Sequence, residues 1–79
     1  KIDIYDPFLN NLKKKYSQDF KVLKNIPNKR NFYDLVMIIV PHRKFVKINI
    51  NKYLSLIKED GFIYDFKNIL NNHKSIIKV

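Results

Sequence analysis

The chain has 79 residues, of which 46% are hydrophobic, and this length fits one small domain. It contains no cysteine, which excludes a disulfide framework, a thiolate nucleophile and a cysteine-ligated metal, and its two histidines lack the spacing of metal ligands. The net charge of +9 raises the question of nucleic-acid binding, but the sixteen basic residues are scattered, with a single run of three at Lys13–Lys15. A solvated basic surface is therefore the preferred interpretation, and nucleic-acid binding is the alternative.

The sequence also carries expectations about the cellular location of the protein and about the extent of the chain. Neither a signal peptide nor a long apolar span is evident, so we expect a cytoplasmic protein without membrane contact. The first residue is Lys1 rather than methionine, and a strand pattern already begins at Ile2. We therefore expect the chain to be a piece of a longer protein.

The first predicted unit is a strand that leads directly into a helix. Polar and apolar residues alternate over Ile2–Tyr5, which predicts a strand. Asp6 can cap a helix N-terminus and Pro7 suits the first helical position. The helix then has an apolar stripe with a period of four, made by Phe8, Leu12 and Tyr16. Asp6 also follows a strand, where it could contact a ligand ribose, although capping alone explains it.

The strongest signal lies in the middle of the chain. Phe20–Leu23 predicts a short strand near a sheet edge, and a polar connection separates it from the apolar run Leu35–Val40. Such a continuous run, rich in β-branched residues, is typical of a parallel strand that is covered on both faces. A short buried helix is the alternative, but Pro41 and the shortness of the run argue against it. The sequence therefore predicts an α/β fold.

The C-terminal half continues the alternation of helices and strands. Asn51 is predicted to cap a helix over about 52–58, whose apolar face holds Tyr53, Leu54 and Ile57. Gly61 is expected to end this helix in the left-handed conformation. Phe62–Tyr64 predicts the last strand, and a short helix is expected over Asn68–His73. The tail from Lys74 is left unassigned.

Polar residues follow three of the predicted strands. Parallel strands place their carboxyl ends at one edge of the sheet, so Asp6, the His42-Arg43-Lys44 cluster and the Asp65-Phe66-Lys67 cluster should converge there. Two basic clusters near helix N-termini suit a phosphate-bearing ligand. His42 is either a ligand contact or a turn residue bonded to nearby backbone, with Phe45 packed beneath it. Arg43 and Lys44 are either solvated or bound to a phosphate.

No catalytic apparatus is evident in the sequence. Gly61 is the single glycine, so no glycine-rich phosphate loop is present. No serine stands in a nucleophile-elbow context, and caps and turns explain the carboxylates. The residues alone thus predict an anion-binding module without catalytic or metal-ligating residues.

Three stretches, Ile4–Pro7, Tyr33–Phe45 and Ile63–Leu70, carry a resemblance to a known family. In sequence, order and spacing they resemble the C-terminal UDP-binding domain of the UDP-glucose/GDP-mannose dehydrogenase family. The similarity is greatest to the branch that acts on UDP-N-acetylhexosamines in bacterial surface polysaccharide (capsule) synthesis. It spans nearly the whole chain, so residues 1–79 are interpreted as a single, partial domain of this kind.

The resemblance implies a three-layer Rossmann-like parallel sheet flanked by helices and lacking its opening strand. The parent would be an NAD-dependent 6-dehydrogenase with a catalytic cysteine and an N-terminal Rossmann domain. The fragment itself is expected to catalyse nothing and to hold no cofactor. Lys67 occupies the position of a basic residue that contacts the nucleotide sugar in the family. The predicted substrate-binding residues are Lys67, Asp65, His42, Arg43 and Lys44.

Three kinds of partner follow from the resemblance. They are a UDP-sugar, the rest of the dehydrogenase chain and a second copy of this chain. The second copy is expected because a missing interior strand leaves unpaired strand edges, unless the flanking strands close directly on each other. A purely structural role in assembling the parent enzyme is a third class of function, beside nucleotide binding and nucleic-acid binding.

Overall fold

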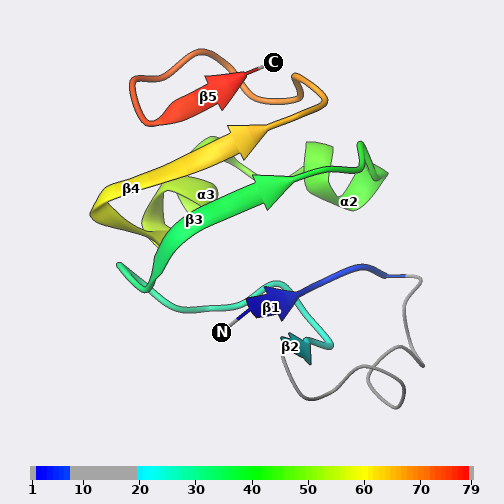
Figure 1. Ribbon diagram of the computed structural model, residues 1–79. Coiled ribbons are helices and arrows are strands. Elements are labelled where there is room, and N and C mark those ends of the chain that lie inside the picture. Colours follow the sequence, from blue (N-terminus) through cyan, green and yellow to red (C-terminus); the bar gives the residue numbers. More distant parts are fainter. Residues whose placement is uncertain (1, 8–19, 79) are drawn as a thin grey trace.

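The computed structural model describes residues 2–7 and 20–78 of the chain, and in them the fold is α/β, as predicted. The strands are β1 (Ile2–Ile4), β2 (Phe20–Val22), β3 (Tyr33–Ile38), β4 (Ile57–Asp65) and β5 (Ile76–Lys78), and the helices are α2 (Arg43–Val46) and α3 (Ile50–Leu56). Figure 1 shows the strands in two groups, with α3 behind β3 and β4.

Every strand pair in the described part of the chain is parallel. β1 pairs with β2 in one sheet, and β3, β4 and β5 form a second sheet in that order. The short strand predicted at Phe20–Leu23 is thus present as β2, which pairs with β1 alone. β1 and β3 do not pair, so the direct closure of flanking strands is not observed. The Tyr33 hydroxyl, which donates to Asp3 Oδ2 at 2.6 Å, links the two sheets.

The central apolar run forms a strand, but its predicted burial on both faces is wrong. Ile38 is 5% exposed and Val36 is partly buried against the core, whereas Leu35 and Met37 are each 47% exposed. The reason is the placement of α3, which contacts β3 and β4 from one side only. Among the described elements, no helix lies over the other face of these strands.

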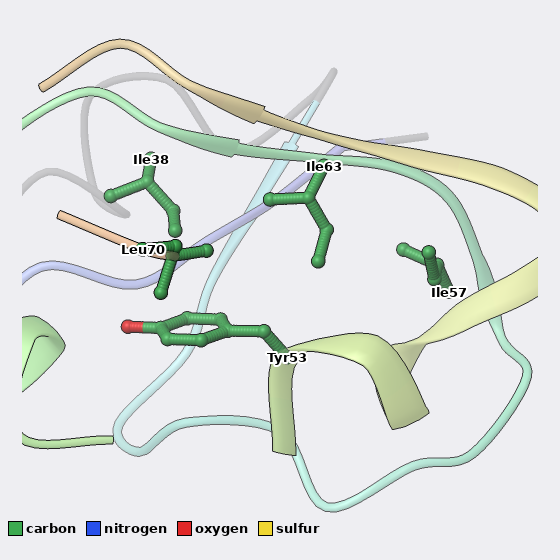
Figure 2. Packing of buried hydrophobic residues seen from close by; sticks show 5 residues of the cluster. All are labelled: Ile38, Tyr53, Ile57, Ile63 and Leu70. Atoms are coloured by element: carbon green, nitrogen blue, oxygen red, sulfur yellow. The ribbon is translucent and has the colours of Figure 1, made fainter. Parts of the chain in front are cut away.

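The core lies between α3 and the three-stranded sheet. Its buried members are Ile38, Tyr53, Ile57, Ile63 and Leu70, and Figure 2 shows Leu70 over the ring of Tyr53. Burial of each large apolar side chain contributes about 1.5 to 3 kcal/mol. This packing fixes the helix and strands from which the polar loops of the carboxyl edge project.

The helix boundaries differ from those predicted. α3 begins after Asn49, whose side-chain oxygen accepts a hydrogen bond from the backbone N–H of Asn51 at 2.8 Å. The predicted cap, Asn51, therefore lies inside the helix. α3 passes into β4 without a connecting loop, because Leu56 ends the helix and Ile57 begins the strand.

Gly61 has a different role from the predicted one. No glycine has positive φ, and Gly61 lies buried within β4 instead of ending a helix. A Cβ at this position would stand 3.0 Å from the carbonyl oxygen of Asp34 and 3.0 Å from the Cβ of Ile57. Close approach of backbone and side chain, rather than left-handed geometry, thus favours glycine here.

The predicted helix over Asn68–His73 is absent, and this segment is a loop. The backbone N–H groups of Ile69 and Leu70 donate to the Asp65 carboxylate instead of starting a helix. The unassigned tail becomes β5, which pairs with the end of β4.

The remaining expectations concern the N-terminal helix, the basic run and membrane-spanning segments. The predicted helix over 7–16 falls mostly on residues 8–19, which are outside the described part of the chain. The Lys13–Lys15 run falls entirely on them. Within residues 2–7 and 20–78, no helix is sufficiently long and apolar to cross a membrane.

Candidate anion-binding edge

The carboxyl ends of β1, β3 and β4 lie at one edge of the fold, as predicted from the parallel topology (Figure 1). Ile38 at the end of β3 stands in register with Asp65 at the end of β4, and the Phe66 backbone N–H donates to the Ile38 carbonyl at 3.0 Å. Tyr5, just after β1, contacts Phe45 edge to face, with ring centroids 5.9 Å apart. The loops after these three strands therefore form one surface, which we call the carboxyl edge.

His42 forms the turn at the end of β3. It is the N-cap of α2, and its Nδ1 accepts from the Lys44 backbone N–H at 3.0 Å. Its ring lies 5.6 Å from the ring of Phe45, which in turn meets Tyr5. These contacts agree with one of the two roles predicted for His42, that of a turn residue bonded to nearby backbone. They do not test the other predicted role, contact with a ligand. They also hold Arg43 and Lys44, both exposed, on the first turn of α2.

Asp65 shapes the neighbouring loop. Its side chain is fully buried, and its two oxygens accept hydrogen bonds from the backbone N–H groups of Ile69, at 3.1 Å, and Leu70, at 2.8 Å. On the other side of the loop, the Lys78 ammonium donates to the Asn68 side chain at 2.6 Å and to the Leu70 carbonyl. The loop between Asp65 and Leu70 is thus fixed from within and from β5.

Lys67 lies on this fixed loop with an exposed side chain. It precedes Asn68, which has φ of 56°, a left-handed conformation that asparagine tolerates better than most residues. The carboxyl edge therefore carries exposed cations on two adjacent loops, Lys67 on one and Arg43 and Lys44 on the other. The helix N-terminus expected after Asp65 is not there, so the positive charge at this loop comes from the Lys67 side chain.

Tyr53 contacts both loops from the core, a role that the sequence pattern did not indicate. Its hydroxyl donates to the Phe45 carbonyl at 2.7 Å, and its ring packs under Leu70. Burial, followed by the negative charge of Asp65, raises the pKa of Tyr53 to about 12. Its position on the apolar face of α3 had indicated only a core residue. The available signal was its hydroxyl, because a buried tyrosine O–H needs a hydrogen-bond partner.

The chemistry that this edge supports is binding of an anion. In the described part of the chain, no three His, Cys, Asp or Glu side chains gather as metal ligands would. The cations that are present belong to Lys and Arg, which bind phosphate oxygens by charge-assisted hydrogen bonds. A ligand with a phosphate or diphosphate group fits this arrangement.

Comparison with known protein families gives a match over most of the chain. The family model described as UDP-glucose/GDP-mannose dehydrogenase family, UDP binding domain, matches residues 1–72, which include all three stretches that carried the resemblance. No curated protein and no solved structure matches the chain. Since the matched region takes in nearly every residue, including both basic loops of the carboxyl edge, the chain belongs to the UDP-glucose/GDP-mannose dehydrogenase family, in the UDP-binding domain.

Proposed function

We propose that the carboxyl edge binds the diphosphate of a UDP-sugar. The observation that carries this proposal is the family match over residues 1–72, and the exposed cations on the two loops support it. Lys67 contacts the nucleotide sugar from the loop fixed by Asp65. Arg43 and Lys44 neutralise the phosphates from the turn that His42 caps.

The chain then serves as the substrate-holding part of an NAD-dependent UDP-sugar 6-dehydrogenase. The substrate that we propose is a UDP-N-acetylhexosamine used for bacterial surface polysaccharide in the cytoplasm. NAD and the catalytic cysteine belong to other parts of such an enzyme, because this chain has neither a cysteine nor a glycine-rich dinucleotide turn. The chain alone is expected to turn over no UDP-N-acetylhexosamine with NAD. Its partners are the rest of the dehydrogenase and a second copy of itself.

A titration followed by NMR tests the ligand. We expect UDP to shift amide resonances of Asp65–Asn68 and of the turn at His42, with larger effects than inorganic pyrophosphate or GDP at the same concentration. Lys67→Ala should weaken UDP binding about five- to tenfold, the loss of one charge-assisted contact of about 1 to 1.4 kcal/mol.

The matched control is Lys74→Ala. Lys74 is also an exposed lysine, but it lies in the loop that leads into β5, and the parallel pairing of β5 with β4 puts the start of β5 opposite the carboxyl edge. It should leave UDP binding unchanged. If both variants weaken UDP binding equally, the affinity depends only on net charge and not on the position of Lys67. If pyrophosphate shifts the same resonances as strongly as UDP does, the edge recognises a diphosphate and not a nucleotide.

The two other classes of function give different results in the same experiment. A nucleic-acid module would bind an oligonucleotide more tightly than UDP and lose that binding steeply as salt is added. A purely structural domain would show no shift with either ligand. Measurable NAD reduction by the purified chain would contradict the expected lack of catalysis.

A further inference from the structure

One face of the three-stranded sheet is apolar and uncovered by any described helix. Its side chains are those that alternate with the core residues of β3, β4 and β5, because successive residues of a strand point to opposite faces. The pairing brings them side by side: Leu35 with Phe62, Met37 with Tyr64, and Tyr64 with Ile77. Phe66 extends the row, with its ring 4.5 Å from that of Tyr64. These six residues, Leu35, Met37, Phe62, Tyr64, Phe66 and Ile77, are called the open face.

The apolar side chains of the open face are substantially exposed to solvent. Leu35, Met37 and Phe62 are each 47% exposed, Ile77 is 41% and Phe66 is 37%. With about 200 Å² for each full side chain, the face presents roughly 400 to 500 Å² of apolar surface. A patch of this size is as large as the largest that a typical monomer exposes, and such patches are often functional.

We propose that a second copy of this chain packs on the open face, sheet against sheet. Two such faces together remove about 800 to 1,000 Å² from water, which is the size of a weak and reversible interface. This names the surface for the self-association proposed above, and it does not depend on UDP binding.

Charge favours a second copy over a polyanionic partner. None of the six side chains is charged, so the face offers nothing to a phosphate backbone, whereas it matches another uncharged apolar face. The chain carries a net charge of +9, and two copies therefore repel each other at low ionic strength. Screening by salt weakens this repulsion, so self-association through the open face becomes stronger as salt is added. Binding of a polyanion would become weaker.

Analytical ultracentrifugation from micromolar to millimolar concentration tests the proposal. We expect the mean mass of the wild-type chain to rise above that of a monomer with concentration, and to rise further with sodium chloride. Phe62→Lys, in the middle of β4, should raise the dimer dissociation constant at least tenfold. Leu35→Lys, its cross-strand neighbour, should do the same, so the result does not rest on one variant.

Ile2→Lys is the control, because Ile2 is 59% exposed on β1, outside the open face, and the substitution adds the same charge. It should leave association near the wild-type level. The proposal is overturned if the wild-type chain stays monomeric throughout, as it would if another segment of the chain covered the face, or if Ile2→Lys dissociates the dimer as strongly as Phe62→Lys. UDP titration of folded Phe62→Lys keeps the two proposals separate, since it should still bind UDP as a monomer.

Discussion

At the scale of single residues, buried polar groups rather than exposed cations determine the shape of the carboxyl edge. Asp65 is fully buried yet has both oxygens bonded to backbone N–H groups of its own loop. Tyr53 supports the same edge through the Phe45 carbonyl. The exposed side chain of Lys67 depends on these two residues for its position.

Replacement of Asp65 should be costly. Asp65→Ala leaves the N–H groups of Ile69 and Leu70 without their acceptor in a buried place, so we expect the free energy of unfolding to fall by about 2 to 4 kcal/mol. Urea unfolding measures this change. The control is Asp34→Ala: Asp34 forms an ion pair with Lys58 at 3.1 Å, but its side chain is 86% exposed. The control should cost no more than about 0.5 kcal/mol, and equal losses would contradict the structural role of Asp65.

The buried hydroxyl of Tyr53 predicts a loss of stability at high pH. Its pKa is about 12 in the folded chain, above the ordinary 10.0, because of burial and then the charge of Asp65. The folded state thus holds this proton more tightly than the unfolded state. The resulting stability is complete below pH 10 and is lost as the pH rises through 12. We expect Tyr53 to account for a fall of about 2 to 3 kcal/mol in the free energy of unfolding.

Tyr53→Phe isolates this contribution from that of other groups that titrate in the same range, including Tyr33, whose pKa is also raised to about 12 by burial and then by its bond to Asp3. Urea unfolding at several pH values between 8 and 12 should show a shallower fall for Tyr53→Phe than for the wild-type chain. Identical pH profiles would show that Tyr53 ionises equally in the two states.

At the scale of elements, α3 and β4 form one continuous unit that carries most of the core. The side-chain oxygen of Asn49 satisfies the N–H of Asn51 where α3 begins, and Gly61 lets β4 pass close to β3. The start of the helix is therefore set by Asn49.

Substitution of the two asparagines distinguishes the observed cap from the predicted one. Asn49→Ala should lower the free energy of unfolding by about 1 kcal/mol, because a helix N–H loses its acceptor. Asn51→Ala is the matched control: it keeps the backbone donor and places a better helix former inside α3, so it should be neutral or slightly stabilising. Thermal unfolding of the two variants measures the difference, and a reversed order would place the helix start at Asn51.

Local apolar pattern predicted most of the elements. The strands at β1, β2, β3 and β4, the helix at α3 and the convergence of the strand ends were all predicted from local pattern and parallel topology. β5 and α2 were not predicted: β5 lies in the tail from Lys74, whose pattern is ambiguous, and the four residues of α2 are too few to show a helical period. Burial of β3 was also overestimated, since a run of apolar residues shows what a strand could bury and not what covers it. Asp65 and Tyr53 bond to backbone groups only four to eight residues away, but these bonds depend on the path of the loops, which the sequence pattern does not show.

At the scale of the whole molecule, the net charge of +9 opposes folding as well as association. Positive side chains repel one another more in the compact state than in the expanded chain, and salt screens this repulsion. The free energy of unfolding should therefore rise, by up to about 1 kcal/mol, between low ionic strength and roughly 0.15 M sodium chloride. Urea, which is uncharged, allows this measurement at fixed salt.

This measurement requires the monomer, because salt also strengthens self-association. It is therefore made at low micromolar concentration and repeated with Phe62→Lys, which should show at least the same rise. A wild-type chain that gains stability with salt only at high concentration would show that association, and not screening within one molecule, is the cause.

The parallel pairing of all the described strands has a consequence for how quickly the chain folds. Ile2 pairs with Phe20, Leu35 with Phe62 and Ile63 with Ile76, so no described ladder joins strands that are neighbours across a tight hairpin. Each ladder requires a long loop to close before its first hydrogen bonds form, and this loss of chain entropy slows the search for the native pairing. α3 and β4 follow each other without a loop, and the junction between them is a local structure that can form early. The transition state for folding is therefore expected to contain this unit, with β3 and β5 added to β4 afterwards.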